Sequence, residues 1–347
     1  MTSRERILAA LDFRPPDTIP LQIHPSQGGL YEHGQKLLDL MRACGHDFGD
    51  AQQFKLPAPP PPTDFDPDGR YHAIRTDEWG TTWQYRIFGV WGHPIAWPLD
   101  DISKLDAYKP PPSPPAVWPG LDAARADARR HRERWFLLGG AGSLFHKLHS
   151  LRRFDDVLVD ILQDTPEINR LADLVTENMA ACVSRALAVD ADAVAFGDDF
   201  GTQTALIFPP KVWRRFFKPR YEALFAPILR AGKRIFFHSC GQIAELLEDL
   251  SGLGVNAIWP QLPLFDMRDL ARRCRGAKAP RLALQLHPDR GDLMQRRSPA
   301  DVRAYLRRML DDFGTRSGGS WLYIEIDPGF PWPNVQALFE TAMELRQ

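Results

Sequence analysis

Short apolar runs alternate with longer helix-like stretches along most of this chain, and no other feature constrains its fold as strongly. The runs are rich in β-branched, aromatic and aliphatic residues, as expected of buried parallel strands. Three of the stretches between them open on a proline, which suits the first turn of a helix. The predicted strands are residues 19–23, 135–138, 193–196, 235–237, 257–259, 281–284 and 321–324, and the predicted helices include residues 166–189, 210–231 and 299–312. Strands that alternate with helices predict an α/β protein with a parallel sheet.

The number of predicted strands favours a (β/α)8 TIM barrel over a dinucleotide-binding sheet, because no Gly-x-Gly-x-x-Gly motif follows the first strand. The first 130 residues are less regular and contain an aromatic section, residues 71–97, that predicts one or two β-hairpins. We therefore expect a single domain over residues 1–347. Residues 1–130 would contain the first strand and an N-terminal extension that covers the barrel mouth. Residues 131–347 would form the main barrel.

Composition excludes several classes of protein. The net charge is −1 with both signs interspersed, which argues against nucleic acid as a partner. No apolar run reaches the roughly 18 residues of a membrane span. The first residues predict an amphipathic helix with a capping box at Thr2 and Glu5, unlike a secretory signal. The cysteines lack the spacing of a disulfide framework, so we expect a cytoplasmic protein with reduced thiols: Cys44, Cys182, Cys240 and Cys274.

The predicted strand at residues 235–237 leads directly into His238 and Cys240. In an extended stretch, side chains two residues apart point the same way, so both donors can face one point. Imidazole and thiolate are a natural pair of zinc ligands. Gly241 then permits a sharp turn into a predicted helix at residues 244–250. The end of a strand is where a barrel places its chemistry, although a backbone-bonded histidine beside a buried cysteine would give the same pattern.

Carboxylates follow two other predicted strands. Asp198 and Asp199 come after residues 193–196, where they can orient a zinc-bound histidine or transfer a proton, or where Asp199 can simply cap a turn. Glu325 follows residues 321–324 and is a candidate third zinc ligand, since catalytic zinc takes three protein ligands and keeps one open position. His287 is the other candidate, with a local turn as its alternative role.

Two further groups stand out. Gln203 and Gln261 follow predicted strands and are expected to line a pocket. His146 and His149 lie three residues apart on a predicted helix, a spacing that can bind metal but that lacks a third donor in the neighbouring sequence.

The chain resembles the uroporphyrinogen decarboxylase superfamily, and within it the zinc-dependent, corrinoid-linked methyltransferases. The resemblance runs through most of the sequence and is carried by the order and spacing of short segments. These are residues 5–11, 16–20, 77–80, 151–154, 198–203, 219–221, 238–241 and 331–335. The fold of this family is a (β/α)8 barrel, in agreement with the strand pattern. We expect Glu78, Trp79, Gln203, Gln261 and His287 to bind substrate.

The resemblance favours methyl transfer over decarboxylation of uroporphyrinogen. The decarboxylases have an arginine-containing stretch that grips substrate carboxylates, whereas residues 21–29 of this chain contain no arginine. The His-x-Cys motif matches the methyltransferases, in which zinc activates a thiol or a methyl donor. Their third zinc ligand is a cysteine on the last strand. This chain has no cysteine after Cys274 and offers Glu325 near that position.

The leading hypothesis is a zinc-dependent methyltransferase that moves a methyl group between a small molecule, such as an aryl methyl ether, and a corrinoid on a partner protein. His238, Cys240 and Glu325 would hold zinc, with His287 or no third residue as the alternatives, and Asp198 and Glu325 would act in catalysis. The alternatives are a decarboxylase or lyase that uses Asp198 and His238 in proton transfer, and a non-catalytic barrel that binds a ligand.

Overall fold

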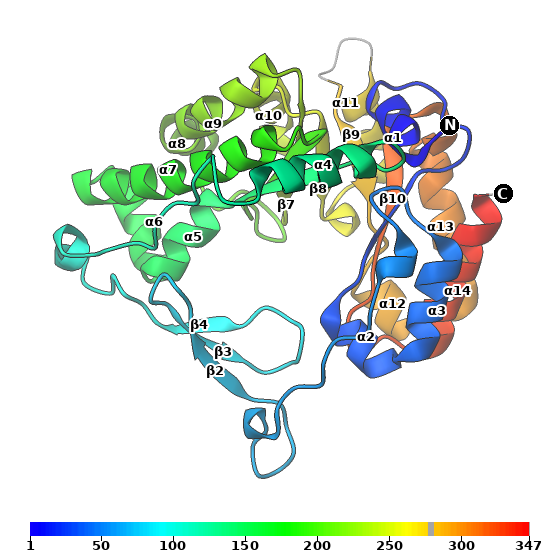
Figure 1. The fold of residues 1–347 in the computed structure, drawn as a ribbon, viewed down its shortest axis with the longest axis horizontal. Coiled ribbons are helices and arrows are strands. Elements are labelled where there is room, and N and C mark those ends of the chain that lie inside the picture. The colour runs from blue at the N-terminus through cyan, green and yellow to red at the C-terminus, as the bar shows by residue number, and fades with distance from the viewer. Residues whose placement is uncertain (277–280, 347) are drawn as a thin grey trace.

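The structure is a computed structural model that describes residues 1–276 and 281–346 (Figure 1). Its strands are β1 Leu21–His24, β2 Ala73–Thr76, β3 Thr82–Tyr85, β4 His93–Ala96, β5 Leu138–Gly142, β6 Ala193–Gly197, β7 Arg234–Ser239, β8 Ala257–Pro260, β9 Ala283–Leu286 and β10 Ser320–Glu325. Its α-helices are α1 Ser3–Leu11, α2 Gln27–His33, α3 Gln35–Cys44, α4 Leu121–Arg132, α5 Leu144–Leu151, α6 Phe154–Gln163, α7 Pro166–Ala188, α8 Pro210–Phe216, α9 Lys218–Arg230, α10 Leu247–Gly252, α11 Met267–Arg275, α12 Asp292–Arg296, α13 Pro299–Asp312 and α14 Trp332–Leu345. None of these helices is long and apolar enough to cross a membrane.

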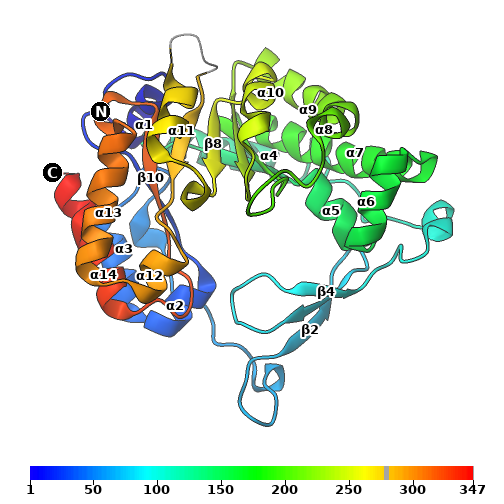
Figure 2. The same ribbon diagram turned by 180° about the vertical axis from the view of Figure 1, so that it is seen from behind.

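Seven strands form one curled sheet in the order β1-β10-β9-β8-β7-β6-β5, and every neighbouring pair is parallel. Helices line the outside of the curl (Figures 1 and 2). The prediction of an α/β fold with a parallel sheet is therefore confirmed. Within residues 1–276 and 281–346, the edge strands β1 and β5 do not pair with each other, so the sheet is a partial barrel.

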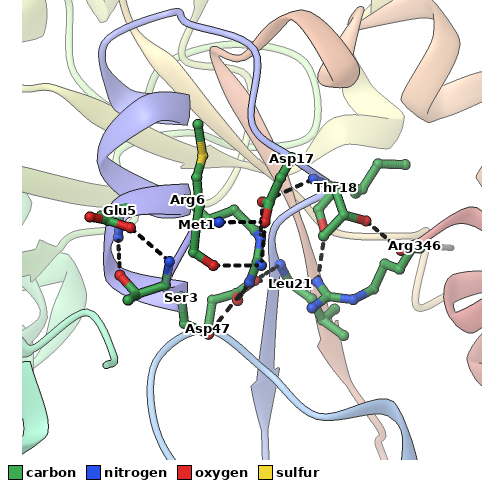
Figure 3. Close-up of polar contacts among 11 residues, drawn as sticks. Met1, Ser3, Glu5, Arg6, Asp17, Thr18, Leu21, Asp47 and Arg346 are labelled. Atoms are coloured by element: carbon green, nitrogen blue, oxygen red, sulfur yellow. Dashed lines mark hydrogen bonds and ion pairs between the residues drawn. The ribbon is translucent and has the colours of Figure 1, made fainter. Parts of the chain in front are cut away.

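Asp47 spans the gap between the two edge strands at their amino-terminal ends. Its backbone N–H donates to the Leu21 carbonyl at 2.8 Å, and its carbonyl accepts from the Phe136 N–H at 3.0 Å. Its buried carboxylate accepts from the Leu21 N–H at 2.7 Å and pairs with Arg6 and Arg346 (Figure 3). Asp47 thus connects β1 to the segment that leads into β5.

The inside of the curl is closed at the same end by packed apolar side chains. Phe136 and Phe236 stack with centroids 5.6 Å apart, and Trp321 lies 5.2 Å from Phe236. Ile7 and Leu11 of α1 belong to the same buried cluster. This end is filled by a core, so an open site belongs at the opposite, carboxyl-terminal end of the strands.

Two predicted elements depart most clearly from the structure. Strand β5 begins at Leu138, where the predicted strand at residues 135–138 ends, because the strand is composed largely of glycine and lacks an apolar run. Gly139 has a packing reason: a Cβ there would lie 2.6 Å from the Cβ of Ala186 on α7. The predicted helix at residues 210–231 is two helices that break at Phe217, just before Pro219, which cannot donate a backbone hydrogen bond.

The predicted hairpins at residues 71–97 are present as a three-stranded antiparallel sheet in the order β2-β3-β4. Trp83 of β3 stacks on His146 of α5, and Phe88 packs edge-on against Tyr31 of α2. Since α2 follows β1 and α5 follows β5, the small sheet and its β3–β4 loop together reach both edges of the partial barrel on its carboxyl-terminal side (Figure 2). The division of the chain at residue 130 stays a prediction.

Candidate metal centre and its cavity

His238, Cys240 and Asp199 bring three different donor atoms together at the carboxyl-terminal ends of β6 and β7. His238 Nε2 lies 3.4 Å from Cys240 Sγ and 3.4 Å from an Asp199 carboxylate oxygen. All three donor atoms lie within 4.8 Å of one another. A nitrogen, a sulfur and an oxygen at these separations can converge on one metal ion.

Hydrogen bonds orient two of the three donors. The Nδ1 atom of His238 lies 2.8 Å from the Trp259 carbonyl, so the proton belongs on Nδ1 and the Nε2 lone pair faces Cys240. The Cys240 N–H donates to the Asp199 carboxylate at 2.9 Å. A metal-ligating histidine commonly donates its other N–H to a carbonyl in this way, and the contact selects the tautomer that can bind metal.

The electrostatics of the group favour positive charge between the donors. Partial burial raises the pKa of Asp199, but its hydrogen bond with His238 outweighs this effect and lowers the pKa to about 2. Partial burial lowers the pKa of His238, but its contacts with Asp199 and Cys240 raise the pKa to about 10. The contacts that favour the charged form of His238 would also favour a metal cation between the donors.

Gly241 allows the loops after β6 and β7 to touch. Its φ is +84°, and a Cβ there would lie 2.1 Å from the backbone of Gly201. The Gly201 N–H donates to the Cys240 carbonyl at 3.2 Å, and the Gln242 N–H donates to the Thr202 carbonyl at 2.8 Å. Asp199 and Cys240 come together because these two backbones meet.

Gly241→Ala is therefore expected to lower the free energy of unfolding by about 3 kcal/mol or more, the sum of left-handed strain and overpacking. Gly232→Ala is the matched control, because Gly232 also has a positive φ, +66°, but a Cβ there meets nothing within 4 Å. The control should cost about 1–2 kcal/mol. Urea denaturation measures both, and equal losses would contradict the close approach of the two loops.

Asp198 points away from this group, as alternation along an extended stretch requires. Its buried carboxylate accepts backbone N–H groups of Leu144 at 3.0 Å, Phe145 at 2.8 Å and His146 at 2.9 Å, and it also accepts the Tyr221 hydroxyl. Burial raises the pKa of Asp198 to about 6 against the opposing effect of these hydrogen bonds. Asp198 thus holds the first turn of α5 in place, and its predicted catalytic role stays a prediction.

Neither predicted third ligand belongs to the described metal group, in which Asp199 supplies the third donor. Glu325 Oε2 instead lies 3.6 Å from Arg290 and 3.4 Å from the Tyr323 hydroxyl. His287 is buried against the rings of Tyr323 and Trp259. Sequence reasoning considered Asp199 as a residue that orients a zinc-bound histidine, transfers a proton or caps a turn, but not as a metal ligand. The available signal was that Asp199 must face the opposite way from Asp198.

A cavity of about 510 Å³ adjoins His238 and Cys240. Three of the predicted substrate-binding residues, Gln203, Gln261 and His287, line it. The structure thus places these three beside the candidate metal centre, and their contact with substrate stays a prediction.

Glu78 and Trp79 lie outside this cavity, in the turn between β2 and β3. Glu78 is exposed. Trp79 is buried under the Lys147 ammonium, which lies 4.7 Å from its ring, and its carbonyl accepts the Tyr108 hydroxyl at 2.8 Å. The contacts of Trp79 are those of a packed turn.

His146 and His149 lie on α5, as predicted, with ring centroids 4.8 Å apart. His146 packs between Trp83 and Trp91. Burial lowers the pKa of both histidines, that of His149 to about 4. Neither belongs to the metal group found in the described part of the chain.

Comparisons with known proteins agree with this architecture. Residues 90–345 match the family model for uroporphyrinogen decarboxylase (URO-D). A methyltransferase from Methanosarcina mazei is similar in structure over 99% of each chain, with a TM-score of 0.63 and 16% identity, which shows a shared fold. A dihydropteroate synthase from Xanthomonas albilineans, solved with 4-aminobenzoic acid, is 17% identical over 47% of this chain and 58% of its own. Its TM-score of 0.34 is too low to indicate a shared fold. No curated protein sequence matches. Because the family model covers most of the chain, this protein belongs to the uroporphyrinogen decarboxylase (URO-D) family.

Proposed function

We propose that this protein is a zinc-dependent methyltransferase that moves a methyl group between a small molecule and a corrinoid carried by a partner protein. The observation that supports it best is the convergence of Asp199, His238 and Cys240 within 4.8 Å. In this proposal Asp199 takes the place of Glu325 as third ligand. Three protein ligands leave a fourth position open, as catalytic zinc sites do. The family implies a (β/α)8 barrel, in which the segment at Asp47 would stand in the gap beside β1.

Zinc bound here would lower the pKa of a thiol or act as a Lewis acid on a methyl donor. The residues of the chain position these components. The Trp259 carbonyl holds the His238 ring, and the Cys240 N–H holds the Asp199 carboxylate. Asp198 holds α5 in place, and α5 carries His146, on which Trp83 of the small antiparallel sheet stacks. The cavity beside Cys240 would receive the small molecule.

A metal-free decarboxylase is the second candidate, and the contact between His238 and Asp199 favours it. A histidine paired with a carboxylate at 3.4 Å can hold a proton for delivery to a carbanion formed when a carboxylate leaves as carbon dioxide. The first-strand region argues against uroporphyrinogen as its substrate, because β1 and the start of α2 carry no arginine to bind several carboxylates.

Metal analysis by mass spectrometry tests the proposal. The purified protein is expected to hold close to one zinc per chain, and Cys240→Ser and Asp199→Asn should each weaken zinc binding by more than the roughly 10–100-fold typical of losing an outer hydrogen-bond partner. Cys182→Ser, a change on α7, is the matched control and should retain zinc.

Glu325→Gln distinguishes Glu325 from Asp199 as the third ligand, because only replacement of the true ligand should lower zinc affinity as strongly as Cys240→Ser does. A wild-type protein that takes up no zinc from zinc-replete medium would overturn the metal proposal. Proton-transfer chemistry at His238 would then be examined.

A further inference from the structure

The wall of the cavity beside Cys240 is largely apolar. Trp259 forms one side, with its ring centroid 4.1 Å from that of His238 and 4.5 Å from that of Tyr323. The other apolar lining residues are Pro260, Leu262, Pro263, Leu264 and Pro288. Prolines and a stacked aromatic group make a stiff, flat surface that suits a ring or a short hydrocarbon chain.

Arg290 is the sole lysine or arginine among the described residues that line this cavity, and its charge is already engaged. Its Nε atom donates to the Asp327 carboxylate at 2.5 Å, and Nη2 donates to the other oxygen of the same carboxylate. Its Nη1 atom lies 3.6 Å from Glu325. Because carboxylates contact both edges of this guanidinium, they offset its positive charge and occupy N–H groups that a ligand would otherwise bind.

The remaining charged lining residues are acidic. Asp289 accepts the backbone N–H groups of Gly291 at 2.8 Å and Leu293 at 3.2 Å, and Asp292 pairs with Arg297 at 2.6 Å. The neutral polar side chains of the lining include His287 and the amides of Gln203 and Gln261. Gln261 Oε1 accepts the Gly241 N–H at 3.0 Å, and its NH2 group has no protein acceptor within the described chain.

We infer that the small molecule taken by this cavity is uncharged and mostly apolar, with an acceptor group that Gln261 can bind, and that the Asp327–Arg290 pair enforces this choice. The inference rests on the proposed metal centre as the place where the reacting atom of that molecule lies. Away from the metal centre itself, an anionic group of that molecule would lose its water without gaining a free cation, and burying an unpaired charge is unfavourable. The same lining argues against a substrate with several carboxylates.

Two thiols of matched shape test the inference: benzyl mercaptan, which is uncharged, and 4-(mercaptomethyl)benzoate, which carries a carboxylate. Titration calorimetry on the zinc-loaded protein should show the uncharged thiol binding at least about tenfold more tightly. Asp327→Asn releases one side of Arg290 and should narrow this difference by improving binding of the carboxylate.

Asp312→Asn is the matched control, because it removes the partner of another arginine, Arg268, outside this cavity, and should leave the ratio unchanged. Equal or tighter binding of the carboxylate by the wild-type protein would overturn the inference.

Failure of the metal proposal is recognised separately, by the absence of zinc. In that case toluene and 4-methylbenzoate replace the thiols, and saturation-transfer NMR on the metal-free protein measures the same charge preference. Toluene signals that exceed those of 4-methylbenzoate would support an uncharged ligand. The reverse order would overturn that inference whatever the metal content.

Discussion

Asp198→Ala is expected to lower the free energy of unfolding by about 3–5 kcal/mol, because several buried donors lose their acceptor together and each unsatisfied donor costs about 1–3 kcal/mol. The Asp198 carboxylate is fully enclosed and accepts three backbone N–H groups of α5 and one tyrosine hydroxyl. Alanine would leave these donors buried without acceptors. Asp198→Asn keeps one acceptor oxygen and should cost less, about 1–3 kcal/mol. Urea denaturation followed by fluorescence measures both.

Asp199→Asn is the informative comparison, because the neighbouring carboxylate is 53% exposed and belongs to the metal group. It should change stability of the zinc-free protein by less than about 1 kcal/mol, as substitutions at exposed positions usually do, while zinc binding is lost. Together the two variants distinguish the role of Asp198, which anchors α5, from the role of Asp199, which binds the metal. A stable Asp198→Ala protein, or an Asp199→Asn protein as unstable as it, would contradict this division of roles.

Asp47→Ala is the second large effect, again about 3–5 kcal/mol. The Asp47 side chain is 1% exposed, and its oxygens accept the Leu21 N–H and pair with Arg6 and Arg346, whose side chains are 13% and 15% exposed (Figure 3). Without the Asp47 carboxylate, two nearly buried guanidinium groups lose a counter-charge. Strand β1 also loses the side-chain hydrogen bond that the Leu21 N–H donates to Asp47. Thermal and urea denaturation of the variant measure the loss.

Asp17→Ala provides the control for Asp47, because Asp17 also pairs with Arg6, at 2.7 Å, but is 38% exposed. An exposed ion pair contributes about 0–1 kcal/mol. The Arg6 guanidinium holds the pKa of the Asp17 carboxyl well below its usual range, so this small contribution should fall away as the pH drops from the ordinary aspartate range toward the lowered pKa. Similar losses for Asp47→Ala and Asp17→Ala would show that burial is not what makes the Asp47 contact strong.

Sequence patterns located the seven strands of the large sheet with differing accuracy. The runs that became β6, β7, β8 and β10 are apolar on both faces because both faces are buried. Strand β5 was misplaced because its glycines carry no apolar signal, and one of them, Gly139, is required by the close approach of Ala186. A contact between residues so far apart in the chain leaves no local trace in the sequence.

The pairing of His238 with Cys240 was readable from the chain, since both residues follow one extended stretch and must face the same way. The third donor of the described group was not. Asp199 comes from a neighbouring strand, and it reaches Cys240 because Gly201 and Gly241 pack backbone to backbone. Glu325 stands near the position expected for a third ligand, but Arg290 and Tyr323 contact it instead.

The sequence by itself therefore determined the α/β class, the parallel strands and the first two donors, because these depend on residue periodicity over a few positions. Tertiary structure decided which carboxylate joins His238 and Cys240, which one anchors α5, and which ones hold Arg290. Each of these choices depends on distances between separate strands and loops. Such distances follow from how the whole sheet curls and packs, which no short stretch of sequence encodes.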